Sequence, residues 1–367
     1  MLTLELIKRG YNVFYLIYDS AITIKHKYEY PAPIYYLPSR DLLSEDNLEF
    51  YHNFLADNKI DIVVNQSGNF GDSALWLNKG LRNKHVRVIS VLHSDPWAGY
   101  KRLFRLLLFR RNNSFIEQCK RIARVLLYCK IRKRHKDARI NHFKYILPLT
   151  DEVCMLSRNF YPDLSEIYGG YENKYITIPN PNSFKESDLI TNLKRKKQIL
   201  FIGLFRAEKN LDAIIKIWKN IYDRFPDWEF VILGGNTGGI ESRINKAIKK
   251  YDRIRMEGFK SPLDYYHQSS ILCMSSLHEG WGMVVTEAMQ CGVVPIAFNS
   301  YASITDIITD GKDGVLVRPF NNKEYECKLC ELMSNNDRRE NLSISAKESI
   351  KRYNIESVVD QWERIFK

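Results

Sequence analysis

Residues 278–298, HEGWGMVVTEAMQCGVVPIAF, constrain the fold more than any other part of this chain. A loop with an acidic residue and a Gly-Trp-Gly turn comes first, then a short helix that ends at Gly292, and then a buried strand of apolar residues. Two carboxylates, Glu279 in the loop and Glu287 in the helix, bracket the first half of this stretch. At about 1.5 Å per helical residue, we expect the two side chains roughly 8–12 Å apart.

That separation suits a nucleotide sugar better than a general acid/base pair, whose carboxyl groups would need to be closer. Between the two glutamates, the amides of Gly282, Met283 and Val284 open the helix without intrahelical partners, and such amides bind phosphate anions. The order of groups therefore predicts contacts with a sugar, a diphosphate and a ribose. From spacing alone, two glutamates on an ordinary helix are the commoner interpretation.

The motif of Glu279, seven intervening residues and Glu287, set in EGWGMVVTEAMQCGVVPI, resembles the signature of retaining glycosyltransferases of family 4. These proteins have the GT-B fold, an α/β architecture of two Rossmann-like doubly wound domains that face a cleft. The resemblance implies that Glu279 contacts the donor hexose and that Glu287 holds the ribose hydroxyls. It also implies that the amides of Gly282, Met283 and Val284 bind the diphosphate.

The second Rossmann-like domain opens with QILFIGLFRAEKNLDAIIKIW, which reads as strand, loop and helix. Members of the family commonly have Gly-Arg at the start of this loop and a lysine five residues after the arginine, both on the diphosphate. Gly203 and Lys209 fit this pattern, but Leu204 stands where the arginine is expected. We expect Arg206 to supply that charge, because the leaving diphosphate gains negative charge in the transition state.

Two further groups of site residues follow from the resemblance. Gly258 and Phe259, in the segment where the family holds the nucleotide base, are candidates for donor binding, although Phe259 also fits a core position. His93 follows the apolar run VRVISVL, at the carboxyl end of a predicted parallel strand, where functional sites lie. A lone histidine there is more often structural, whereas the resemblance implies a place near the sugar.

Composition and length describe a globular protein of two domains: 367 residues, 45% hydrophobic and 27% charged. No apolar run approaches the roughly 20 residues of a membrane span, and no signal peptide precedes LTLELIKRG. The seven cysteines are scattered, which fits a reducing cytosol. Cys327 and Cys330 form a C-x-x-C within a predicted helix, without the second pair that a zinc site would need.

The net charge of +12 is concentrated in residues 101–139, where fourteen Lys or Arg face only Glu117 and Asp137. Leucines and phenylalanines at helical spacing separate the charges, a pattern that predicts basic amphipathic helices on an anionic membrane surface. A solvated helix face and a nucleic-acid patch are the alternatives, and no nucleic-acid motif accompanies the charges. The candidate membrane-contact residues are Arg102, Arg105, Arg110, Arg111, Lys120, Arg121 and Arg124.

We expect an N-terminal acceptor-side domain over 1–181, a nucleotide-sugar domain over 182–350, and a final helix over 351–367 that crosses back to the first domain. The hinge falls in the polar, Pro-bearing segment 179–192. Members of the family begin one strand and one Gly-rich loop earlier than this sequence does. We therefore expect an N-terminal domain without its first strand, most simply because the start codon is misplaced.

The sequence thus predicts a retaining, metal-independent hexosyltransferase of the type that builds lipopolysaccharide or capsule. It would act in the cytoplasm at the inner membrane face and need no cofactor beyond its nucleotide-sugar donor. The expected acceptor is a glycan or a lipid-linked sugar, and nucleic acid is not an expected partner. Two alternatives stay open: a nucleotide-sugar epimerase or hydrolase of the same fold, and a catalytically inactive donor-binding subunit.

Overall fold

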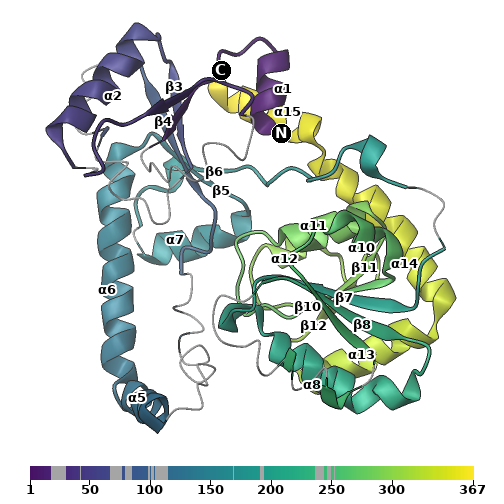
Figure 1. Ribbon diagram of the computed structural model, residues 1–367. Coiled ribbons are helices and arrows are strands. Elements are labelled where there is room, and N and C mark those ends of the chain that lie inside the picture. The colour runs from purple at the N-terminus through teal and green to yellow at the C-terminus, as the bar shows by residue number, and fades with distance from the viewer. Residues whose placement is uncertain are drawn as a thin grey trace. The chain divides into compact units, whose positions relative to one another are not determined.

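The computed structural model describes most of the chain: residues 1–17, 30–41, 43–66, 77–78, 85–97, 100, 103, 115–167, 169–190, 194–235, 244–245, 249–251 and 253–367. The chain divides into two compact units. The first comprises 1–96, 136–181 and 353–367, and the second comprises 97–135 and 182–352. Both units combine parallel sheets with helices (Figure 1).

The first unit contains a four-stranded parallel sheet of order β3-β4-β5-β6: β3 (Ile62–Asn65), β4 (Arg87–Leu92), β5 (Glu152–Met155) and β6 (Tyr175–Thr177). A separate parallel pair consists of β1 (Tyr15–Ile17) and β2 (Ile34–Tyr36). Helix α2 (Glu45–Asp57) starts at Ser44, whose hydroxyl accepts a hydrogen bond from the Asn47 amide. Its buried Tyr51, Phe54 and Leu55 form an apolar cluster with Leu37 after β2.

The C-terminal helix α15 (Ile355–Phe366) belongs to this first unit. Its buried Val358 and Trp362 pack with Ile89, Val91 and Cys154 of the sheet. Helix α1 (Leu2–Lys8) lies beside it, and Arg9 just beyond α1 donates to Asp360 at 2.6 Å and to Glu363 at 2.8 Å. The last residues of the chain therefore complete the core of the N-terminal unit.

The second unit is built on a six-stranded parallel sheet of order β12-β11-β10-β7-β8-β9. Its strands are β7 (Gln198–Ile202), β8 (Glu229–Leu233), β9 (Ile254–Gly258), β10 (Ile271–Met274), β11 (Val294–Phe298) and β12 (Val315–Val317). Strand order steps outward from β7 in both directions, as in a doubly wound domain. Figure 1 shows helices on both faces of this sheet.

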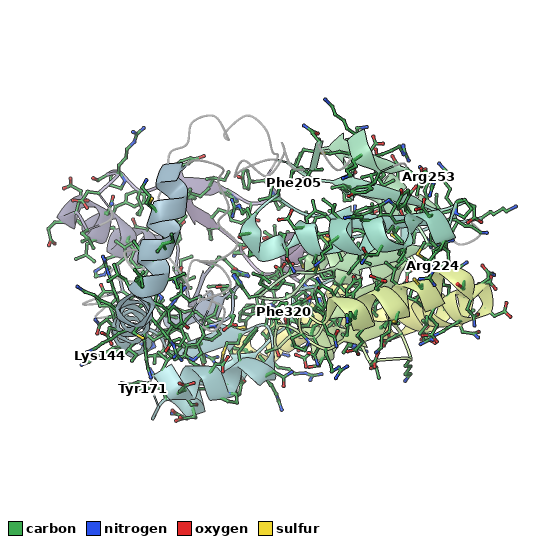
Figure 2. The ribbon with its side chains drawn as sticks, turned by 90° about the horizontal axis from the view of Figure 1, so that it is seen from below. Lys144, Tyr171, Phe205, Arg224, Arg253 and Phe320 are labelled. Atoms are coloured by element: carbon green, nitrogen blue, oxygen red, sulfur yellow. The ribbon has the colours of Figure 1, made fainter. Side chains whose placement is uncertain are left out.

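One face of the sheet carries α8 (Leu211–Ile221) and α13 (Asn322–Ser334), which contact each other. Their buried residues form one apolar cluster with alternate residues of the strands, such as Ile199, Phe230 and Ile296. Phe205, labelled in Figure 2, extends this cluster from the loop after β7 and is only 2% exposed. The core thus reaches the loop that follows the central strand.

Residues 97–135 group with the second unit, whereas the sequence predicted the whole basic segment in the N-terminal domain. The division at residue 135 falls inside α6 (Tyr128–Ile146), which follows α5 (Phe115–Leu126). At the other end of the second unit, α14 (Asn336–Ser349) and a 3-10 turn precede α15, so two helices are divided near Tyr353 as the sequence indicates. Among the described residues, no helix is long and apolar enough to span a bilayer.

Candidate functional site

The predicted donor-binding residues gather at the carboxyl ends of the strands of the second unit. Backbone hydrogen bonds join the ends of β7, β8 and β9: the Gly203 amide donates to Leu233 O at 3.0 Å and the Gly234 amide donates to Gly258 O at 2.9 Å. The Phe205 amide also donates to Gly235 O at 2.9 Å. This edge of a parallel α/β sheet is where such domains bind ligands.

Lys209 and Glu279 form an ion pair at this edge. The Lys209 Nζ donates to the Glu279 Oε1 at 2.5 Å, and both side chains are largely shielded from solvent. The Ser275 hydroxyl, just after β10, donates to the Lys209 carbonyl at 2.9 Å and so holds the backbone of the lysine. The structure therefore brings together two residues that are separated by 70 positions in the sequence.

Helix α11 (Met283–Gln290) begins and ends where the sequence predicts. Gly282 precedes it with φ +94°, a conformation that favours glycine, and a Cβ there would lie 2.6 Å from the Tyr301 hydroxyl. At the other end Gly292 has φ +72°, and the Val293 amide donates to Ala288 O at 2.8 Å, as in a Schellman motif. The first turn of α11, with Met283 and Val284, thus follows directly on the loop that carries Glu279.

Glu287 lies on α11 with its carboxylate between two hydroxyl groups. The Ser183 hydroxyl donates to its Oε1 at 2.8 Å, and the Tyr266 hydroxyl donates to its Oε2 at 2.8 Å. Burial raises the pKa of the Glu287 carboxyl above its usual value, whereas these two hydrogen bonds lower it. A partly buried, oriented carboxylate of this kind is suited to accept hydrogen bonds from a ligand.

Gly258 and Phe259 end β9 beside this edge. Gly258 has φ +74° and turns the chain outward, so that the Phe259 side chain is 86% exposed. The interpretation of Phe259 as a core residue is therefore wrong. Its ring has the exposure that a residue must have to contact a ligand base, although nothing in the structure tests that contact.

Arg206 lies in the same loop as Lys209 but has a more open setting. Its side chain is about half exposed, at 51%, and its guanidinium lies 3.8 Å from the Glu208 carboxylate. Gly203 lies against the Lys209 side chain: a Cβ added at Gly203 would lie 3.5 Å from Lys209 Cδ. The role of Arg206 on a diphosphate stays a prediction.

His93 belongs to the first unit and follows β4. Its Nε2 lies 2.6 Å from the Gln66 Oε1, so the ends of β3 and β4 meet as the sequence indicates. The imidazole is exposed, but partial desolvation by the surrounding protein lowers its pKa. A place for His93 near a donor sugar stays a prediction.

Three of the predicted membrane-contact residues, Lys120, Arg121 and Arg124, lie on α5, and the Lys120 side chain is exposed. The other four, Arg102, Arg105, Arg110 and Arg111, lie outside the described residues. Large apolar side chains are exposed on and just after α5: Ile122 at 57%, Leu126 at 79% and Leu127 at 53%.

Sequence reasoning missed Tyr266 and Ser183, the two partners of Glu287. Tyr266 lies on α10 (Leu263–Gln268), and its side chain is fully buried. Ser183 lies in the segment that was predicted as a hinge. Neither has a local sequence signal, because each meets Glu287 only through the tertiary fold. Within the described parts of the chain, no cluster of three or more His, Cys, Asp or Glu is arranged to hold a metal ion.

Two parallel α/β units of this kind define the GT-B fold, and solved structures of that fold superpose on the chain. Sucrose-phosphate synthase from Thermosynechococcus elongatus matches 100% of this chain and 90% of its own at TM-score 0.75 and 16% identity. HepE of Anabaena, in complex with UDP and glucose, matches 91% of this chain and 85% of its own at TM-score 0.66 and 12% identity.

The family model Glycosyl transferases group 1 matches residues 183–349, which lie within the second unit. The amylovoran biosynthesis glycosyltransferase AmsD of Erwinia amylovora is 27% identical over 226 residues, which cover 59% of this chain and 62% of AmsD. The chain spans between 55% and 62% of the length of the first three curated relatives that it matches. All of the predicted donor residues except His93 lie inside 183–349.

Proposed function

We propose that this protein is a retaining glycosyltransferase of family 4 that moves a hexose from a nucleotide-diphosphate sugar to a glycan or a lipid-linked acceptor. The observation that carries the proposal is the arrangement of two partly buried carboxylates at α11. Glu279 is paired with Lys209 before the helix, and Glu287 is held by two hydroxyls within it. The match of the Glycosyl transferases group 1 model over the same residues supports this assignment.

Lys209 supplies positive charge for the diphosphate in this proposal. A nucleoside diphosphate gains negative charge as the bond to the sugar breaks, and a preorganised cation stabilises that charge. In the structure, the Glu279 carboxylate lies 2.5 Å from the Lys209 ammonium group and balances its charge. Donor binding would bring phosphate oxygens to Lys209 and hexose hydroxyls to Glu279, so each partner would exchange the ion pair for a ligand contact.

The proposed transfer is a front-face substitution at the anomeric carbon, with retention of configuration. The acceptor oxygen bonds to that carbon on the face from which the diphosphate leaves, and the carbon–phosphate oxygen bond breaks. The acceptor proton passes to the leaving phosphate oxygen. The step needs no enzyme nucleophile and, in this proposal, no metal ion; Arg206 and His93 would contact the diphosphate and the sugar.

A binding experiment with nucleotides tests the donor site. Isothermal titration of the purified protein with UDP, GDP and their glucose conjugates should reveal one preferred base; UDP is the first probe because it is bound in the HepE structure. Glu287→Ala should weaken the preferred ligand by about 10- to 150-fold, the equivalent of one or two charged hydrogen bonds. Glu348→Ala is the matched control, since Glu348 is 74% exposed. Equal binding by wild type and Glu287→Ala would remove Glu287 from the site.

Turnover measurements separate the proposal from its two alternatives. An epimerase or hydrolase consumes the nucleotide sugar without an acceptor, whereas a transferase releases the nucleoside diphosphate at a rate that depends on the acceptor. An inactive subunit binds the donor and never releases product. The similarity to an amylovoran biosynthesis glycosyltransferase makes intermediates of amylovoran biosynthesis the acceptors to test first. The anomeric configuration of the product, read by proton NMR, tests retention.

We also propose that α5 binds the anionic inner surface of the cytoplasmic membrane. Exposed apolar residues, among them Leu126 at 79%, accompany exposed basic residues such as Lys120. This combination gives both burial in the interface and attraction to anionic lipid. Vesicle flotation should require anionic lipid and weaken as salt rises. Leu126→Asp should reduce it, whereas Ile344→Asp, at a site that is 68% exposed on α14, should not.

A further inference from the structure

The carboxylate of Glu287 is oriented by two hydroxyls from two separate segments that precede it in the sequence. Ser183, 104 positions earlier, donates to Oε1 at 2.8 Å. Tyr266, 21 positions earlier, donates to Oε2 at 2.8 Å. Each carboxylate oxygen therefore has one fixed donor, and both donors are neutral hydroxyls that cannot cancel the negative charge.

The remaining acceptor capacity of this carboxylate matches a vicinal diol. A carboxylate offers about four lone-pair positions, two on each oxygen. Ser183 and Tyr266 occupy one position on each oxygen, which leaves one on each for a ligand. Two adjacent acceptors can receive two hydrogen bonds at once from neighbouring hydroxyls, as on the 2′ and 3′ carbons of ribose. A 2′-deoxyribose would satisfy only one of them.

Both hydroxyls are themselves held in place. The Tyr266 side chain is fully buried, and its carbonyl accepts a hydrogen bond from Arg195 at 2.9 Å. The neighbour of Ser183, Phe184, exchanges two backbone hydrogen bonds with the Gln290 amide group, at 3.2 Å and 3.0 Å. Because Gln290 lies one turn after Glu287 on α11, the helix itself positions the serine that orients its carboxylate.

We propose that Tyr266 and Ser183 are positioning residues that make the donor site selective for a ribonucleotide over its 2′-deoxy counterpart. This inference rests on the proposed function, because it takes Glu287 as the group that contacts the ribose. Without the two hydroxyls the carboxylate could rotate and would meet the diol through one oxygen at a time. Tyr266 and Ser183 would therefore affect the ratio of the affinity for the ribonucleotide to the affinity for its 2′-deoxy counterpart, as well as each affinity.

The test is isothermal titration of the full chain with UDP, 2′-deoxy-UDP, GDP and 2′-deoxy-GDP. The wild type should prefer the ribonucleotide of its base by about 10-fold or more, the value of one lost hydrogen bond to a charged group. Tyr266→Phe should reduce this ratio to within about threefold, and Ser183→Ala should reduce it partly. Ser183→Thr keeps a hydroxyl and should keep the ratio. Ser183→Ala also carries the test if Tyr266→Phe does not fold.

Tyr325→Phe is the matched control for loss of a buried phenol. The Tyr325 side chain is fully buried, and its hydroxyl donates to Ile296 O at 2.8 Å on the other face of the sheet. This variant should lose stability and keep the ribonucleotide ratio. Unchanged ratios in both Tyr266→Phe and Ser183→Ala, with a selective wild type, would overturn this inference and leave the proposed function intact. Failure of the wild type to bind any nucleotide would instead remove the proposed function and, with it, this inference.

Discussion

Replacement of Gly234 by alanine should disrupt the ends of the strands that form the donor site. Gly234 has φ +147°, and an added Cβ would lie 1.8 Å from the Gly203 carbonyl oxygen and 3.1 Å from a Phe205 ring carbon. Ordinary contacts of a Cβ begin near 3.4 Å, so the two backbones must separate by more than 1 Å. Neither contact can relax through a flexible side-chain end, because one is backbone and the other belongs to a buried ring.

The cost has two parts of similar size. Forcing a Cβ into a packed site costs about 1–3 kcal/mol, and a non-glycine residue in this backbone region costs about 1–3 kcal/mol more. We therefore expect Gly234→Ala to lower the free energy of unfolding by about 2–6 kcal/mol, measured by urea denaturation followed by circular dichroism. Nucleotide affinity should fall as well, because Gly203 and the Lys209 loop follow directly from the displaced end of β7.

Gly235→Ala is the matched control, one residue further along the same loop. A Cβ at Gly235 would meet nothing closer than a Phe259 ring carbon at 4.0 Å, and its backbone does not need positive φ. This variant should stay within about 0.5 kcal/mol of the wild type. If Gly234→Ala and Gly235→Ala unfold at the same urea concentration, the close approach of β7 and β8 at this point is refuted.

Two further predictions concern the charged groups of the site. Lys209→Met should weaken nucleoside diphosphate binding by about 10- to 150-fold in a titration. Lys216→Met, at an exposed position on α8, should leave the affinity unchanged. Equal losses of affinity in the two variants would refute a specific contact of Lys209 with the diphosphate. Burial raises the pKa of Glu287 in the folded protein above 4.5, its value in the unfolded chain. The charged carboxylate therefore destabilises the folded protein at pH values above the folded-state pKa. This destabilisation disappears as the pH falls through the folded-state pKa towards 4.5. Glu287→Gln should therefore unfold at higher urea than the wild type at neutral pH and lose this advantage in acid; a pH-independent difference would contradict the burial argument.

Helix α11 could be predicted from the sequence because the residues that start and end it lie next to it. Gly282 and Gly292, which flank the eight-residue helix, each have positive φ, at +94° and +72°. The loop residues Gly203 and Lys209 could be predicted through the family motif, which fixes their spacing. In both cases the information lies within a few residues of the position it determines.

Exposure and long-range pairing could not be predicted in the same way. Phe259 follows a strand, and its apolar side chain fits a core equally well until Gly258, with φ +74°, turns the chain outward. The partners of Glu287 lie 21 and 104 positions away, so no window of sequence contains them all.

Helix α11 connects ligand contact to the start of the C-terminal unit. Glu287 and Gln290 lie one turn apart and hold Ser183 and Phe184, the first residues after the division of the chain at residue 181. A ligand that donates hydrogen bonds to the Glu287 carboxylate would share its oxygens with the Ser183 and Tyr266 hydroxyls. Since Gln290 fixes Phe184 independently of the ligand, the segment keeps its place while the serine hydroxyl responds. These three hydrogen bonds from α11 thus hold the polar segment that begins the unit, and through Ser183 they link its position to nucleotide selectivity.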